Sequence, residues 1–145
     1  MREVRPREMR PEGLALLVFL KALELAGGPE ELIRRRHLTW VPTLMAAAYA
    51  VVLREQWART DEEIARELGT TVQTVRHMLR ADPDRVQARL EEPMPEDEAS
   101  RDHIAGGLAK LAYRRLRHGG ERVALMDTLA EAQEMLRAEE AAVAM

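Results

Sequence analysis

Residues 60–80, TDEEIARELGTTVQTVRHMLR, decide the fold that this sequence predicts. Thr60 followed three residues later by Glu63 forms a capping box, the pattern with which many helices begin. Gly69 marks an abrupt helix end, because glycine enters the left-handed backbone conformation without strain. The two threonines that follow offer the next N-cap. The stretch therefore predicts two short helices joined by a tight turn.

Apolar residues recur at helical spacing in both halves of this stretch. They are Ile64, Ala65 and Leu68 in the first helix and Val72, Val75 and Leu79 in the second. Two helices that cross steeply can touch closely only where one side chain is small, which is the role expected of Ala65. Gly69 reverses the chain four residues later, and Val75 then fills the angle between the helices.

These offsets resemble the helix-turn-helix of bacterial and archaeal regulators, including the sigma-factor and LuxR-type versions. The resemblance covers residues 60–80 of the 145. It implies a DNA-binding transcriptional regulator whose recognition helix spans residues 71–80. Helix-turn-helix units also serve as plain interaction folds, so the alternative is a protein-protein interaction module that does not bind DNA.

The residue types on the outward side of helix 71–80 suit a DNA groove. Arginine can fork onto guanine and glutamine onto adenine, whereas hydroxyl groups and cations hold phosphates and set the register. The expected base contacts are Gln73, Thr74, Arg76 and His77, and the expected phosphate contacts are Thr70, Thr71, Arg80, Arg54 and Arg59. One helix reads only a few base pairs, so the partners expected are double-stranded DNA and a second copy of the chain in a homodimer.

The rest of the chain also shows helical periodicity, and the predicted fold class is all-α. Further helices are expected over residues 13–26, 29–36, 42–58, 83–90, 100–118 and 121–141. Helix 42–58 would be the first of a three-helix unit completed by the helix-turn-helix. Residues 83–90 lack the alternation of a β-hairpin, which predicts a unit without a wing.

An acidic segment with two prolines, residues 92–99, is the one clear linker. It divides a helical domain, residues 1–91, from a C-terminal helical hairpin, residues 100–145. Such a hairpin cannot bury its apolar face alone, so it must pack on the N-terminal helices or on a second copy. Gly106 and Gly107 interrupt its first helix, which indicates either close helix packing or a ligand that approaches bare backbone. The second reading leaves room for a small-molecule effector.

Charge is unevenly distributed along the chain. The formal net charge is −3, which as a bulk property counts against DNA binding. Residues 31–59 and 70–90 are nonetheless net basic, whereas acid gathers in residues 91–102 and after residue 127. This pattern fits a basic face for phosphates. It equally fits helix surfaces that carry many ion pairs between neighbouring side chains.

Several classes of function lack support in the sequence. There is no cysteine, which removes disulfides and thiolate metal sites. The four histidines form no pair at helical ligand spacing, and neither a phosphate-binding loop nor a catalytic triad is present. We therefore expect no metal, no cofactor and no enzyme activity. Residues 14–25 are too short and too charged for a membrane span, which favours a cytoplasmic protein.

A second similarity extends beyond the motif. Residues 21–32, 36–40 and 103–113, taken with the helix-turn-helix, are similar to a small family of helical proteins from thermophilic microbes. Its members are described as regulatory, DNA-binding-like domains. The similarity implies a regulator and supplies neither a site residue nor a ligand.

Overall fold

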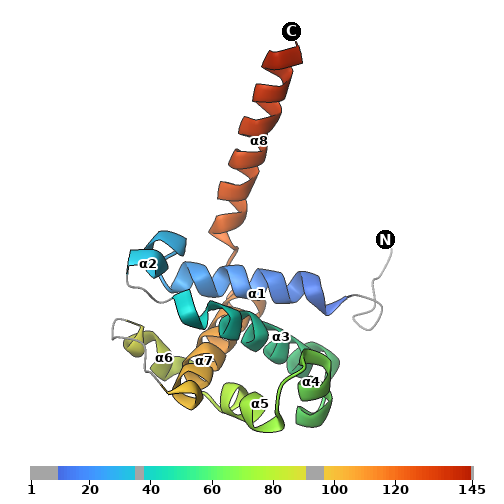
Figure 1. The fold of residues 1–145 in the computed structure, drawn as a ribbon, viewed down its shortest axis with the longest axis vertical. Helices are drawn as coiled ribbons and strands as arrows, with labels where there is room; N and C mark the ends of the chain where they lie inside the picture. The colour runs from blue at the N-terminus through green and yellow to red at the C-terminus, as the bar shows by residue number, and fades with distance from the viewer. Residues whose placement is uncertain (1–9, 35–37, 91–96, 145) are drawn as a thin grey trace.

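The computed structural model describes residues 10–34, 38–90 and 97–144 (Figure 1). All the regular structure in these ranges is helical, which confirms the all-α prediction. The helices are α1 (Pro11–Leu25), α2 (Pro29–Arg34), the 3₁₀ turn η2 (Leu38–Trp40), α3 (Val41–Trp57), α4 (Asp61–Leu68), α5 (Val72–Leu79), α6 (Pro83–Arg89), α7 (Glu98–Arg117) and α8 (Ala124–Ala144).

The predicted helices correspond to observed ones with small shifts at the ends. The helix expected over residues 121–141 begins later, at Ala124, and the one expected over residues 29–36 reaches Arg34, beyond which residues 35–37 lie outside the described part. Most of the predicted linker, residues 92–96, also lies outside it. The end of that linker already belongs to α7, because Asp97 accepts a hydrogen bond from the Ser100 amide, N–O 3.0 Å, and caps the helix.

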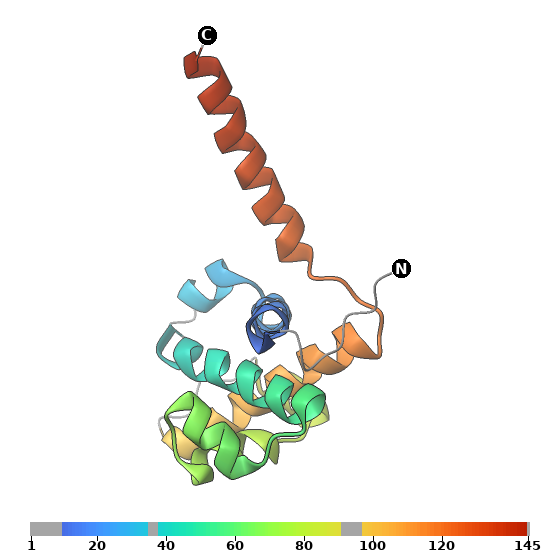
Figure 2. The ribbon, with the colours of Figure 1, turned by 90° about the vertical axis from the view of Figure 1, so that its right-hand side faces the viewer.

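The core lies between α1, α3 and α7, which pack on one another, and α5 and α6 pack on α7 from the other side (Figures 1 and 2). Val18, Leu44, Val51 and Leu108 are among its fully buried side chains. α4 contacts α3 and α5. α7 is therefore the central helix of the body.

Two glycines let α7 take that position. A Cβ atom on Gly106 would lie 1.9 Å from the carbonyl oxygen of Met78 in α5, and one on Gly107 would lie 3.1 Å from the Cβ of Val86 in α6. Of the two sequence readings of this pair, close helix packing is therefore the one that the structure supports.

The C-terminal hairpin expected over residues 100–145 does not form in the described structure. α7 packs on α1, α3, α5 and α6, so it shares their core across the predicted domain boundary. Its apolar side is thereby used, and α8 instead projects from the body as a single helix (Figures 1 and 2). α8 has no buried residue. No helix in the described ranges is both long and apolar enough to cross a membrane.

The base of α8 is nonetheless firmly attached to α1. The Lys21 ammonium, 4% exposed, donates to a Glu24 carboxylate oxygen at 2.7 Å and to the Arg122 carbonyl oxygen at 2.9 Å. It also lies 3.1 Å from a Glu121 carboxylate oxygen. Burial lowers the pKa of Lys21, but the hydrogen bonds to Glu24 and Glu121 outweigh it, and the pKa lies above its ordinary value. Glu24 in turn accepts the Leu125 amide at 3.3 Å, so the first turn of α8 is held in place.

Candidate nucleic-acid interface

The start of α4 is fixed by the capping box that the sequence predicts. The Thr60 hydroxyl accepts the Glu63 amide at 3.1 Å, and the Glu63 carboxylate accepts the Thr60 amide at 3.0 Å. The bond from the Thr60 amide, with that from its side chain, holds the pKa of Glu63 below its ordinary value. Gly69 ends the helix at φ 69°, and the Thr70 amide then donates to the Ala65 carbonyl oxygen at 3.0 Å.

Three residues separate α4 from α5, and α5 packs through one side. The Thr71 hydroxyl accepts the Thr74 amide at 3.1 Å, which confirms it as the N-cap. Val75 and Met78 are buried, whereas Val72 is half-buried. Ala65 of α4 is also buried, at the position where the sequence requires a small side chain. Met78 was not among the apolar positions singled out from the sequence, although it follows Val75 at helical spacing.

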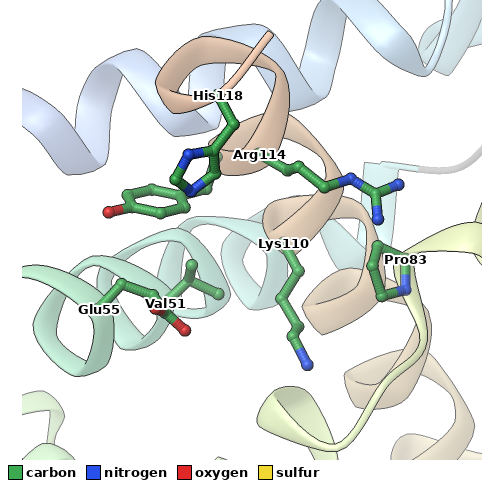
Figure 3. Close-up of a pocket in the computed structure, with 7 residues that line it drawn as sticks. Val51, Glu55, Pro83, Lys110, Arg114 and His118 are labelled. Atoms are coloured by element: carbon green, nitrogen blue, oxygen red, sulfur yellow. The ribbon is translucent and has the colours of Figure 1, made fainter.

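α7 braces α5 from behind at two points. The first is the close approach of the Gly106 backbone to Met78. The second is the Lys110 ammonium, which donates to the carbonyl oxygens of Leu79 at 2.7 Å and Ala81 at 3.0 Å. A cation there also complements the negative end of the α5 dipole. Figure 3 shows Lys110 extending from α7, as one of the residues that line the neighbouring cavity.

The outward side of α5 is open to solvent within the described structure. Gln73, Arg76 and Arg80 are exposed, and Thr74 and His77 are half-buried. The Gln73 amide nitrogen lies 3.5 Å from the His77 ring nitrogen. The structure thus brings the four residues expected to contact bases onto the one helix whose other side is held by the core.

Acidic residues of α4 stand close to this face. The Arg76 guanidinium lies 3.3 Å from an Asp61 carboxylate oxygen and 3.6 Å from a Glu62 carboxylate oxygen. Asp61 also pairs with Arg54. Burial raises the pKa of Asp61, but hydrogen bonds from Arg54 and Arg76 outweigh it, and the pKa lies below its ordinary value. Asp61 is therefore a carboxylate that already shares two arginines.

The residues expected to contact phosphates are in different situations. Arg54 donates its Nε–H to the Arg59 carbonyl oxygen at 2.8 Å and pairs with Asp61, so it joins α3 to α4, and its role as a phosphate contact stays a prediction. Arg59 lies 3.6 Å from Glu63 with its side chain 44% exposed. The Thr71 hydroxyl is used in the cap, and Thr70 is half-buried. Arg80 is exposed and has no ion-pair partner among the described residues.

A buried carboxyl group lies on the inner side of this region. Asp102 of α7 is 4% exposed. Burial raises its pKa above the ordinary value, and the charge of Glu98 adds to this, although the neighbouring charges of His77 and Arg101 oppose it. Sequence reasoning missed this residue. Its spacing of three and seven residues from Ala105 and Ala109 was the available signal that it shares their buried face.

Two small cavities border α7 in the described structure. One, of ≈ 190 Å³, lies between α3 and α7 and is lined by Val51, Glu55, Pro83, Lys110, Tyr113, Arg114 and His118 (Figure 3). The other, of ≈ 130 Å³, lies between α6 and α7 and is lined by Ala81, Asp82, Arg85, Val86, Arg89, His103 and Ile104. Ligand sites usually measure about 300–1,000 Å³. Neither of these two cavities is lined by Gly106 or Gly107.

Comparison with protein-family models, with curated proteins and with solved structures gave no match for this chain.

Proposed function

We propose that this protein is a sequence-specific DNA-binding transcriptional regulator that uses α5 as its recognition helix. The observation that carries the proposal is the contrast between the two sides of α5. The inner side is held by Gly106 and Lys110 of α7, and the outer side presents Gln73, Arg76 and Arg80 to solvent. A helix fixed in this way can enter a groove without being reordered.

The ion pair of Arg76 with Glu62 is compatible with DNA binding. Its side chain is 47% exposed, and the carboxylate of Glu62 beside it is 59% exposed. Ion pairs in such surroundings contribute about 0–1 kcal/mol. A bidentate contact to guanine contributes about 1–3 kcal/mol of discrimination, so Arg76 can exchange Glu62 for a base edge at small cost.

The proposal is tested by fluorescence anisotropy of labelled duplex fragments, titrated with the full chain at several salt concentrations. We expect binding that weakens as salt rises, because displaced counterions drive part of the affinity. Affinity no tighter than millimolar at low salt, or affinity indifferent to salt, would exclude DNA as the partner.

A matched pair of variants separates base reading from phosphate contact. Arg76→Ala is expected to weaken binding to some duplexes and spare others, with a loss of about 1–3 kcal/mol on the preferred sequence. Arg80→Ala is expected to weaken binding to all duplexes by a similar factor and to reduce the salt slope by about one. If Arg76→Ala weakens binding to all duplexes by the same factor, Arg76 contacts a phosphate and not a base.

The second candidate function is a protein-protein interaction module, and a specific observation favours it. Asp61 and Glu62 flank the outward side of α5, where their charge repels phosphates. Glu62→Gln distinguishes the two functions because it removes one charge from an exposed position. A DNA-binding protein should bind duplexes more tightly after this change. If neither the wild type nor this variant binds duplexes at low salt, the interaction module becomes the better reading.

A further inference from the structure

α8 is a lone amphipathic helix. Leu129, Leu136 and Val143 follow one another at seven-residue spacing, and Leu125, Met126 and Ala132 lie beside this row. The large side chains of the row are open to water: Met126 is 44% exposed, Leu129 49% and Leu136 62%. Asp127, Glu131 and Glu134 occupy the opposite side. Gln133 and Glu140 interrupt the apolar side between the row and Met126. A mainly apolar stripe and an acidic stripe therefore run along a helix that touches the body only at its base.

Such a helix lacks the contacts that stabilise most protein helices. In water the stability of protein helices comes mostly from packing of the apolar side against other elements. A contiguous apolar stripe on a protein surface usually marks an interaction site. The hydrogen bonds from Lys21 to Glu24 and to the Arg122 carbonyl oxygen fix the direction in which α8 leaves the body. The helix is therefore anchored at one end and uncovered along the rest.

The body offers a second uncovered apolar surface on the helix that anchors α8. On α1, Leu16 is 42% exposed and Leu17 is 37% exposed, and Leu20 beside them is half-buried. α8 contacts α1 at its base. The stripe of α8 and this row of α1 are two uncovered apolar faces on one chain, each without cover from the described residues.

We infer that the partner of α8 is a second copy of this chain, with the two α8 helices packed antiparallel through their apolar stripes. Charge decides the orientation. In a parallel pair Glu139 and Glu140 of the two copies would lie side by side and repel. In an antiparallel pair with position 126 beside position 143, these glutamates are separated from each other and lie toward the positive end of the other helix dipole. The end of each α8 then also comes beside the α1 row of the other copy.

The size of the surface suits a weak dimer. α8 has 21 residues and is therefore about 31 Å long. Only the side of α8 that carries the stripe can face a partner helix, so this side and the row on α1 together supply fewer residues than the about 20–30 a side of standard stable interfaces. We therefore expect a dimer that dissociates on dilution.

The inference does not depend on DNA binding. α8 leaves the body on the side of α1 and α2, whereas α4 and α5 lie on the far side (Figures 1 and 2). Pairing through α8 therefore leaves both α5 helices uncovered. The oligomeric state can be measured without DNA, so failure of this inference and failure of the proposed function give different results.

The first test is the solution mass of the full chain by sedimentation equilibrium. We expect twice the 16.5 kDa of one chain at about 100 μM, with dissociation on dilution. Leu129→Glu with Leu136→Glu should give the mass of one chain at the same concentration. The matched control, Ala138→Glu with Ala142→Glu, adds the same charge away from the stripe and should remain dimeric.

Circular dichroism and thermal unfolding show whether the variant Leu129→Glu with Leu136→Glu still folds. We expect it to fold because neither leucine is buried in the body. A wild type that stays monomeric at about 100 μM overturns the inference, as does a stripe variant that remains dimeric. Loss of the dimer in the control as fully as in the stripe variant also counts against it.

The second test is the orientation, and the absence of cysteine from the chain makes it clean. Met126→Cys and Val143→Cys are prepared as separate variants, mixed and oxidised. Antiparallel pairing predicts that the mixed disulfide between positions 126 and 143 dominates. Disulfides mainly between identical positions would show parallel pairing and overturn the proposed orientation.

Discussion

α7 and α8 are helices of nearly equal length, 20 and 21 residues, and both carry apolar side chains every three or four positions. α7 buries ten residues, among them Leu108 and Gly106. α8 buries none. Helical periodicity indicates that one side of a helix must be covered, but it does not indicate which element covers that side. In α7 the cover comes from the same chain, and for α8 we have proposed that it comes from another.

The largest difference between the two helices should appear on truncation of a matched leucine. Leu108 of α7 is 0% exposed, so Leu108→Ala should lower the free energy of unfolding by about 2–5 kcal/mol at every protein concentration. Leu136 of α8 is 62% exposed, so Leu136→Ala should have an effect only where dimers form. Urea titrations at low and high protein concentration measure both. An equal loss for both variants after dilution would show that α8 is packed on its own body.

The local part of the fold was the part that the sequence predicted well. The Thr60 and Glu63 capping box, the end at Gly69 and the N-cap at Thr71 each depend on residues within four positions of one another, and each is confirmed. Contacts between distant residues were not predictable in this way. The pairing of Arg54 with Asp61 and the burial of Asp102 depend on how α3, α4 and α7 meet in space.

The same division applies to the candidate interface. Periodicity placed Gln73, Thr74, Arg76 and His77 on one side of a helix, and the structure shows that side open. The ion pairs of Arg76 with Asp61 and Glu62 were not predictable from it, because they require the crossing of α4 and α5. Gly106 and Gly107 gave a partial signal. Two glycines inside a helix cost about 1 kcal/mol each, which indicates a compensating contact without naming its partner.

The second prediction uses that contact. Gly106→Ala places a methyl group 1.9 Å from the Met78 carbonyl oxygen, which forces backbone apart. Alanine has the higher helix propensity, which alone would stabilise α7 by about 1 kcal/mol. Overpacking typically costs about 1–3 kcal/mol, and a contact this short should cost at least the upper value, so we expect a net loss of stability. The control is Gly13→Ala in α1, where the added atom meets nothing within 4 Å and should stabilise the chain slightly. Chemical unfolding compares the two, and a Gly106→Ala variant as stable as the wild type would show that α5 does not rest on α7.

A third prediction concerns the cation that holds the end of α5. Lys110→Met removes the donor to the Leu79 and Ala81 carbonyl oxygens, a loss of about 1.5–3 kcal/mol for hydrogen bonds from a charged group. Arg114→Met, one turn later on α7, removes an ion pair to Asp84 in which both side chains are exposed. That pair should contribute less than about 1 kcal/mol. The rate of hydrogen exchange of the α5 amides should rise in the Lys110 variant alone. An equal rise in both variants would show that Lys110 does not hold the end of α5.

The smallest expected effect, on the order of 1 kcal/mol or less, comes from Asp102→Asn and depends on pH. Burial raises the pKa of Asp102 in the folded chain, and Glu98 adds to this. The folded state therefore binds the proton more tightly than the unfolded state does. Below the ordinary pKa of aspartate both states are protonated and nothing is lost, whereas stability falls as pH rises through the ordinary and then the raised pKa.

Asparagine cannot ionise, so Asp102→Asn should stabilise the chain at neutral pH, and the gain should disappear in acid. The measurement is the difference in free energy of unfolding between variant and wild type at a series of pH values. A variant that is less stable at neutral pH would mean that the Asp102 carboxylate is held by His77 and Arg101 more strongly than burial opposes it. In that case α7 would brace α5 through charge as well as through the close contact at Gly106.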